Sequence, residues 1–117
     1  ELWSIERVRY LNGKALILDV NYFLKEFVPG LTPQIAASSI YDYIENTLGM
    51  QIITSKRRIT VEHATARDEN LLDMGTYGCV VVVANQTFNA AGLPFEYTQS
   101  RHQPDYFCFQ DIATRKK

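Results

Sequence analysis

Two arginines near the beginning of the chain, Arg7 and Arg9, are the first residues whose type and spacing suggest a chemistry. They are two residues apart in a segment of β-type composition, so their side chains point to the same side of one strand. Two guanidinium groups placed in this way repel each other unless carboxylates pair with them or an anion lies between them. A phosphate group accepts forked hydrogen bonds from both. The spacing therefore indicates either an anion site or two cross-strand ion pairs.

A second candidate is the polar segment from Glu96 to His102. If this segment is a strand, its even-numbered residues Glu96, Thr98, Ser100 and His102 share one face. Carboxylates and hydroxyls of this kind exchange hydrogen bonds with the hydroxyls of a sugar. An ordinary solvated face of an antiparallel sheet has a similar composition, and the pattern alone leaves both interpretations open.

Other chemistries lack a recognisable motif. The soft metal ligands of the chain, two histidines and two cysteines, are His63, His102, Cys79 and Cys108. Their spacing is not that of a zinc site. The chain has no Gly-x-Ser-x-Gly nucleophile motif and no Gly-rich phosphate loop. We therefore expect no metal, no cofactor and no catalytic residue. A lyase-like enzyme stays the alternative, because Asp19, Glu96 or His102 could supply a titrating group.

The composition is that of one small domain without a concentrated cationic surface. The chain has 117 residues, 46% of them hydrophobic, with 12 basic and 13 acidic residues and a net charge of −1. Because DNA-binding surfaces need clustered positive charge, we expect no nucleic-acid contact within residues 1–117. Apolar runs are shorter than the roughly 20 residues of a membrane span, and no signal peptide is recognised. Cys79 and Cys108 lie in apolar runs typical of buried free thiols, so we expect a cytoplasmic location and no membrane.

The elements that position these residues follow from the hydrophobic periodicity. Two β-type runs, Leu2–Tyr10 and Ala15–Val20, flank Asn12-Gly13 and predict a hairpin. Thr32-Pro33 then marks the beginning of a helix whose apolar spacing continues to Leu48.

The second half of the chain reads mainly as strands. An acidic helix capped by Thr65 is predicted after the first of them, and the uninterrupted valine run is typical of a strand buried on both faces. The predicted strands are Gln51–His63, Cys79–Phe88, Pro94–His102 and Tyr106–Ile112. The order ββ-α-β-α-βββ predicts an α+β domain with a mostly antiparallel sheet and flanking helices.

Many of these segments, taken in order, resemble the UTRA domain, the effector-binding domain of the HutC/FarR branch of GntR-type transcription repressors. The segments that carry the resemblance are Arg7-x-Arg9, Asn12-Gly13, Ile17-Leu18-Asp19, Asn21-Tyr22-Phe23, Pro29-Gly30-Leu31-Thr32, Ser38 to Glu45, Gly49, Leu71-Leu72, Val80–Val83 and Pro94-x-Glu96-Tyr97-Thr98-x-Ser100-Arg101. Within that family the residues of these segments are most similar to those of the trehalose operon repressors.

The resemblance implies a fold similar to chorismate lyase, without that enzyme's activity, and a pocket for a phosphorylated sugar, with trehalose 6-phosphate favoured. The phosphate ligands implied by the family are Arg7, Arg9, Ser39 and Tyr41. The implied sugar ligands are Asp19, Glu62, Glu96 and His102. Asp19 stands where Glu is commoner, and His102 where many relatives carry Tyr.

The resemblance also implies the wider organisation. Residues 1–117 form the effector-binding domain, and a winged helix-turn-helix that binds operator DNA is expected before them, in a homodimeric repressor. The serine hydroxyls are better placed for a phosphate if a short turn over Thr32–Ala36 is followed by a break and a main helix from Ser38.

Overall fold

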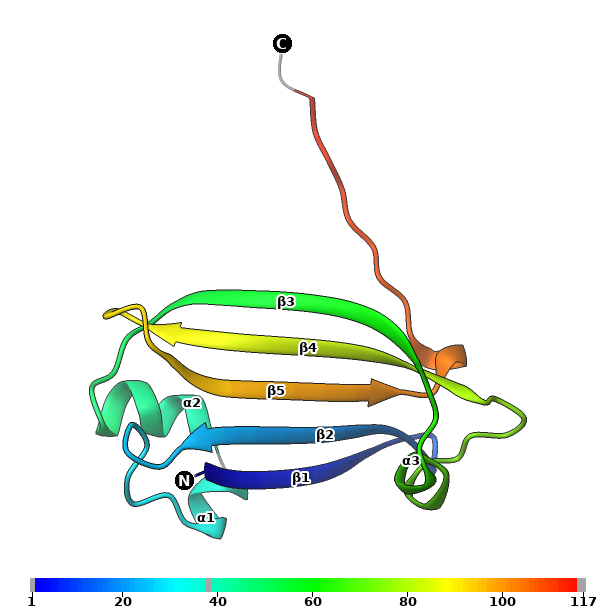
Figure 1. Ribbon diagram of the computed structural model, residues 1–117, viewed down its shortest axis with the longest axis horizontal. Helices are drawn as coiled ribbons and strands as arrows, with labels where there is room; N and C mark the ends of the chain where they lie inside the picture. Colours follow the sequence, from blue (N-terminus) through cyan, green and yellow to red (C-terminus); the bar gives the residue numbers. More distant parts are fainter. Residues whose placement is uncertain (1, 38, 116–117) are drawn as a thin grey trace.

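The computed structural model describes residues 2–37 and 39–115, and its centre is a five-stranded antiparallel sheet with the order β1-β2-β5-β4-β3 (Figure 1). The strands are β1 (Leu2–Leu11), β2 (Lys14–Leu24), β3 (Ile52–His63), β4 (Cys79–Asn89) and β5 (Pro94–His102). Short helices pack on the sheet, so the predicted α+β class is confirmed.

The hairpin of β1 and β2 forms at the predicted turn. Asn12 and Gly13 both have positive φ, 52° and 80°, as a tight two-residue hairpin turn requires. Asn and Gly adopt this conformation at little cost, and the turn fixes the register of the two strands. In that register Arg7 lies opposite Asp19, and Arg9 lies opposite Ile17.

The helical segment between β2 and β3 is broken. α1 covers Pro33–Ala37, and α2 covers Ile40–Asp42 and continues as a π-helical turn, η1, over Tyr43–Thr47. A single helix from Thr32 to Leu48 is therefore wrong, and the alternative with a break is confirmed. Ser39 is the N-cap of α2, since its Oγ accepts a hydrogen bond from the Asp42 amide at 3.3 Å. Ser38, the expected first residue, lies outside the described residues.

The helices lie on opposite sides of the sheet. We call the side that carries Arg7, Asp19 and Glu96 the front face. On it, α1 and α2 cover one end of the sheet through an apolar cluster of Phe23, Val28, Leu31, Ile40, Ile44 and Phe95. On the back face, α3 (Ala66–Leu71) lies near the other end (Figure 1). Its cluster is Leu18, Val20, Leu72, Met74, Val80 and Val82. No helix among the described residues covers the middle of the front face.

The predicted cap of α3 is confirmed. Thr65 Oγ1 accepts a hydrogen bond from the Asp68 amide, and the Asp68 carboxylate accepts one from the Thr65 amide. Asp68 also binds Arg101 of β5, with Oδ1 and Oδ2 at 2.8 and 2.9 Å from Nε and Nη2. This buried ion pair fastens α3 to the back of β5.

Two features of the second half differ from the predictions. Tyr106–Ile112 is no strand: Pro104–Tyr106 form a 3-10 turn, η2, and the chain then runs away from the sheet (Figure 1). β5 is already paired on both sides, by β2 and β4, so the residues that follow it find no free edge beside them. As a consequence Cys108 is exposed, while Cys79 is half-buried and both thiols are free.

The valine run of β4 is buried on one face only. Val80 and Val82 are fully buried against α3, whereas Val81 and Val83 on the front face are half-buried. The prediction of burial on both faces was wrong because no helix in residues 2–37 and 39–115 lies above the front side of β4.

Candidate functional site

The register of the sheet brings the predicted polar residues together on the front face. Asp19 lies opposite Arg7 on one side and Ser100 on the other. Two residues along β2, Asn21 lies opposite Thr98. Because side chains alternate along a strand, all of these groups point to the same side. They form a polar surface across β1, β2 and β5.

One end of this surface is closed by α2 into a cavity of about 180 Å³. Four of the predicted residues line it, Arg7 from β1, Ser39 and Tyr41 from the beginning of α2, and Glu96 from β5, together with Asn21. These positions are far apart in the sequence and meet because the break before Ile40 turns α2 over the sheet. A larger hollow of about 450 Å³, between β1 and α1, borders the other side of Arg7.

The Glu96 carboxylate is the buried floor of the cavity, with 3% of the residue exposed. The Tyr41 hydroxyl donates to it, at 2.8 Å from Oε1 and 2.9 Å from Oε2. Asn21 Nδ2 and Thr98 Oγ1 donate to Oε2 at 3.2 and 3.0 Å. Burial raises the pKa of Tyr41, and the charge and hydrogen bond of Glu96 raise it further, against the opposing effect of Arg7. Tyr41 therefore stays a neutral donor at the mouth of the cavity.

The two arginines of β1 have different surroundings. Arg9 pairs with Asp19, with Nε 2.6 Å from Oδ2 and Nη2 3.2 Å from Oδ1. Asp19 also accepts a hydrogen bond from Ser100 Oγ at 2.6 Å. Arg7 borders the cavity, and in the part of the chain that the structure describes it makes no ion pair or hydrogen bond. The two alternatives for the arginine pair thus apply to one residue each: Arg9 has a carboxylate partner, and Arg7 is available to an anion.

His102 ends the polar surface. It is half-buried, and its ring meets the ring of Phe107 edge-on, with 5.2 Å between the centroids. Burial lowers the pKa of His102, as does the charge of Arg9, while Asp19 acts in the opposite direction. Its Nδ1 atom is buried without a hydrogen-bond partner among the described residues. A neutral imidazole with an unsatisfied nitrogen is suited to a ligand hydroxyl.

Asn21 is a site residue that our reading of the sequence missed. It is buried, and its Oδ1 has no hydrogen-bond partner in the described part of the chain. A buried amide oxygen without a partner is costly, so its presence in a cavity wall points to a ligand or water donor. The signal was available: Asn21 is two residues from Asp19 in a predicted strand, so the two share a face.

Glu62 does not belong to this surface. It lies opposite Val80, so its side chain is on the back face, where Oε1 is 3.4 Å from Nη1 of Arg101. The side chain is 46% exposed. The structure therefore separates it from the other predicted sugar ligands, and we leave it out of the site.

Residues 2–37 and 39–115 contain neither a cluster of metal ligands nor a helix that could span a membrane. His63 and Cys79 are cross-strand neighbours, but no three His, Cys, Asp or Glu side chains gather where they could hold an ion. No helix in these ranges is long and apolar enough to cross a membrane. The site consists of a guanidinium without a partner among the described residues and hydroxyl donors at one end, and buried acceptors along the sheet, an arrangement that can hold a phosphorylated polyol.

Comparisons with known proteins identify the family of the chain. The model of the UTRA domain family matches residues 1–108. The HTH-type transcriptional regulator TreR of Bacillus subtilis is 42% identical over 117 residues, all of this chain and 49% of the relative. A repressor of Escherichia coli, MngR of the mannosyl-D-glycerate transport and metabolism system, is 28% identical over 98% of this chain and 48% of its own length. The chain thus spans about half the length of these regulators.

Solved structures show the same fold. The effector-binding domain of the B. subtilis trehalose repressor TreR superposes with a TM-score of 0.87 at 42% identity, over 99% of this chain and 81% of that one. A GntR-family regulator of Bacillus cereus superposes with a TM-score of 0.89 at 24% identity, over 97% of this chain and 79% of that one. The relatives named here are transcription regulators and not enzymes, as we expected from the sequence.

Proposed function

Because the chain belongs to the UTRA domain family, we propose that it is the effector-binding domain of a transcription repressor and that it binds a phosphorylated sugar on the front face of the sheet. The observation that carries the proposal is the cavity in which Arg7, Ser39 and Tyr41 meet. Arg7 has no carboxylate partner among the described residues, and the cavity is beside it. A phosphate needs such a charge and such donors.

The phosphate binds at the α2 end of the site in this proposal. Arg7 supplies the positive charge and Ser39 a hydroxyl donor. The Tyr41 hydroxyl either turns from Glu96 to the phosphate or keeps its hydrogen bonds to the Glu96 carboxylate and holds that group in position. Arg9 contributes positive potential, but its Nε and Nη2 atoms already donate to the Asp19 carboxylate. Arg7 is therefore the principal phosphate ligand in this proposal.

The sugar lies along β2 and β5 in this proposal. Glu96, Asn21, Asp19 and His102 present acceptor atoms to hydroxyl groups, and two of these atoms, Asn21 Oδ1 and His102 Nδ1, lack a partner within the described residues. From Glu96 to His102 the strand extends about 20 Å, at roughly 3.3 Å per residue. A surface of this length favours two sugar rings over one.

Trehalose 6-phosphate is the effector we favour. It combines a phosphate with a disaccharide, which matches one anion end and a long acceptor surface. The relative of 42% identity is named a trehalose repressor, and that name supports the choice.

For the whole protein we propose a cytoplasmic homodimer that binds operator DNA through a winged helix-turn-helix preceding this domain. The effector then shifts the dimer between two arrangements of its DNA-binding heads. The shift can be no larger than the difference in effector affinity between the two arrangements. The DNA contact lies outside residues 1–117, whose net charge is −1.

Calorimetric titration of this chain tests the proposal. The probes are trehalose 6-phosphate, glucose 6-phosphate and trehalose, with product analysis after each titration. We expect trehalose 6-phosphate to bind, trehalose to bind at least about tenfold more weakly because its phosphate contacts are lost, and no product to form. Equal affinity for trehalose contradicts the phosphate site, and turnover of any probe contradicts the sensor function.

A further inference from the structure

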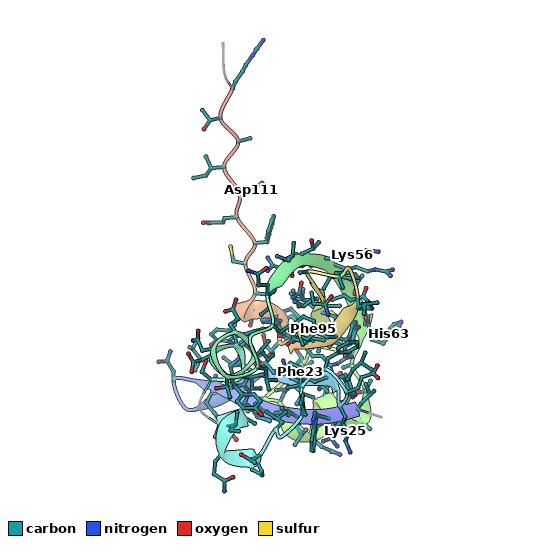
Figure 2. All side chains as sticks on the ribbon, turned by 90° about the vertical axis from the view of Figure 1, so that its left-hand side faces the viewer. Phe23, Lys25, Lys56, His63, Phe95 and Asp111 are labelled. Carbon is teal, nitrogen blue, oxygen red and sulfur yellow. The ribbon has the colours of Figure 1, made fainter. Side chains whose placement is uncertain are left out.

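Three consecutive basic residues of β3, Lys56, Arg57 and Arg58, take no part in the site described above. They alternate between the two faces of the sheet, so that Arg57 is on the front face and Lys56 and Arg58 are on the back face. Both back-face side chains are exposed, and neither makes an ion pair or hydrogen bond with a described residue. Figure 2 shows Lys56 at the outer rim of the sheet, apart from Phe23 and Phe95 of the front-face cluster.

Two tyrosines lie side by side on the same back face. Tyr22 of β2 and Tyr97 of β5 are cross-strand partners, with ring centroids 6.4 Å apart and ring planes inclined by 31°. We call the two rings the tyrosine platform. Beside it is a hollow of about 380 Å³ whose walls include Leu2, Leu24 and Pro94. Tyr97 is 40% exposed, and no helix among the described residues covers this end of the back face, since α3 lies near the other end (Figure 1).

The register of the sheet joins the tyrosine platform and the basic residues in one row. On β2, β5, β4 and β3, the residues that follow one another across the back face are Tyr22, Tyr97, Gln86 and Lys56. Neighbouring strands are about 4.8 Å apart, so the backbones of Tyr97 and Lys56 are about 10 Å apart, with Gln86 between them. Arg58 is two residues along β3 and on the same side. An aromatic surface, an amide and a pair of positive charges thus follow one another.

No carboxylate among the described residues pairs with these two positive charges. Of the acidic residues in the five strands, only Glu6 and Glu62 are on the back face. Glu6 pairs with Arg67 of α3, and Glu62 Oε1 lies 3.4 Å from Nη1 of Arg101. The potential at the β3 end of the row is therefore positive and favours an anionic ligand.

We propose that this row is a binding site for a nucleoside 5′-phosphate. The base stacks on the tyrosine platform, the ribose hydroxyls contact the Gln86 amide, and the phosphate binds between Lys56 and Arg58. A tyrosine ring can stack on any base because every base has a π face, and ammonium and guanidinium groups both bind phosphate. The site is on the opposite face of the sheet from the cavity at Arg7, so the inference goes beyond the proposed function and does not rest on it.

Calorimetric titration of the 117-residue chain with four probes tests the site. The probes are adenosine 5′-monophosphate (AMP), adenosine, ribose 5-phosphate and inorganic phosphate. We expect AMP to bind with a dissociation constant of about 1 mM or lower, and each of the other probes at least about fivefold more weakly, because each lacks the base or the phosphate. The proposal is overturned if AMP produces no binding heat up to about 10 mM, or if inorganic phosphate binds as tightly as AMP.

A tyrosine variant tests the stacking surface. Tyr97→Ala should weaken AMP binding at least about fivefold, the lower end of what stacking on one aromatic ring contributes. Tyr10→Ala is the control, since Tyr10 is a 68% exposed tyrosine at the other end of β1. It should stay within about twofold of the wild-type chain. Wild-type affinity in Tyr97→Ala contradicts the proposal.

The basic triplet supplies its own matched control. Lys56→Ala combined with Arg58→Ala should weaken AMP binding at least about tenfold, because charge-assisted contacts to the phosphate are lost. Arg57→Ala removes the same charge from the same part of β3 but from the front face, and should stay within about twofold. Charged side chains also keep an edge strand from pairing with other chains, a role that all three residues can share. Equal losses in the double variant and in Arg57→Ala therefore contradict a site on the back face.

Arg7→Ala separates this site from the effector cavity. AMP bound on the back face should keep its affinity within about twofold in this variant. A loss of AMP binding in Arg7→Ala without a loss in Tyr97→Ala places the nucleotide in the effector cavity and overturns the inference, while the proposed function stands. Circular dichroism confirms that each variant is folded.

Discussion

Replacing Asp68 by alanine should destabilise the domain more than any other single change to a carboxylate. Asp68 is fully buried between α3 and β5, and each carboxylate oxygen accepts a hydrogen bond from Arg101, at 2.8 and 2.9 Å. Burial alone raises the pKa of Asp68, but the hydrogen bonds from Arg101 and Thr65 outweigh it and lower the pKa. The group is therefore a charged carboxylate whose partners are fixed.

The magnitude follows from what is left behind. Asp68→Ala leaves Arg101, which is 8% exposed, without its main counter-charge. Breaking a buried ion pair by removing one partner costs about 3–5 kcal/mol. A domain of this size has a free energy of unfolding of about 5–15 kcal/mol, so a large share is lost. Urea denaturation should show a lower midpoint with an unchanged slope.

Two further variants separate the buried charge from other causes. Glu62→Gln also removes a carboxylate near Arg101, but that side chain is 46% exposed, so we expect a loss of at most about 1 kcal/mol. Asp68→Leu combined with Arg101→Met removes both charges and should recover most of the lost stability. A loss below about 1 kcal/mol for Asp68→Ala refutes the reasoning, because it falls in the range of an exposed pair.

The same contacts give a pH dependence. The folded pKa of Asp68 is below its unfolded value of about 3.9, so its contribution is complete above that value. It is lost as the pH falls through the folded pKa, which makes Asp68 part of the acid limb of the stability profile. Asp68→Ala should therefore flatten that limb in urea melts recorded across acidic pH.

Two other predictions concern single positions. Burial lowers the folded pKa of His102, so the unfolded state binds more protons than the folded state as the pH falls below about 6.5. The free energy of unfolding should therefore decrease in that range. His102→Gln should remove this contribution to the pH dependence of stability, as measured by denaturation curves from pH 7 to 5. Gly30 has φ +74° and an added Cβ would lie 2.8 Å from the Tyr43 hydroxyl, whereas Gly92 has φ +77° and open space. Gly92→Ala should cost about 1–2 kcal/mol for the backbone alone, and Gly30→Ala more; equal losses in urea would contradict the contact.

Local signals were sufficient for most of the fold. Asn12-Gly13 predicted the hairpin because a two-residue turn needs two positive φ angles, and Thr65 predicted the cap because a hydroxyl satisfies the first helical amides. Once β1 and β2 are in register, Arg7 and Asp19 are forced onto one face. The position of Arg7 on the same face of the sheet as Asp19 therefore follows from a local signal.

Features that depend on distant partners were not visible. Tyr106–Ile112 has the composition of a strand, but a strand also needs an edge, and β5 has none to offer. The face of Glu62 depends on the register of β3 against β4, which no short pattern fixes. Likewise, only the structure shows that Arg9 reaches Asp19 and leaves Arg7 to the cavity.

The central claim is that Arg7 holds the phosphate of the effector. Titration of Arg7→Ala with trehalose 6-phosphate tests it, with Arg57→Ala as the control. Arg57 is an exposed arginine of β3 opposite Asn85, so the control removes the same charge from the same face of the sheet.

Losing one charge-assisted hydrogen bond costs about 1.5–3 kcal/mol, so Arg7→Ala should weaken binding by roughly 10- to 150-fold. Arg57→Ala should stay within about twofold of the wild-type chain. Wild-type affinity in Arg7→Ala, or an equal loss in both variants, contradicts the account.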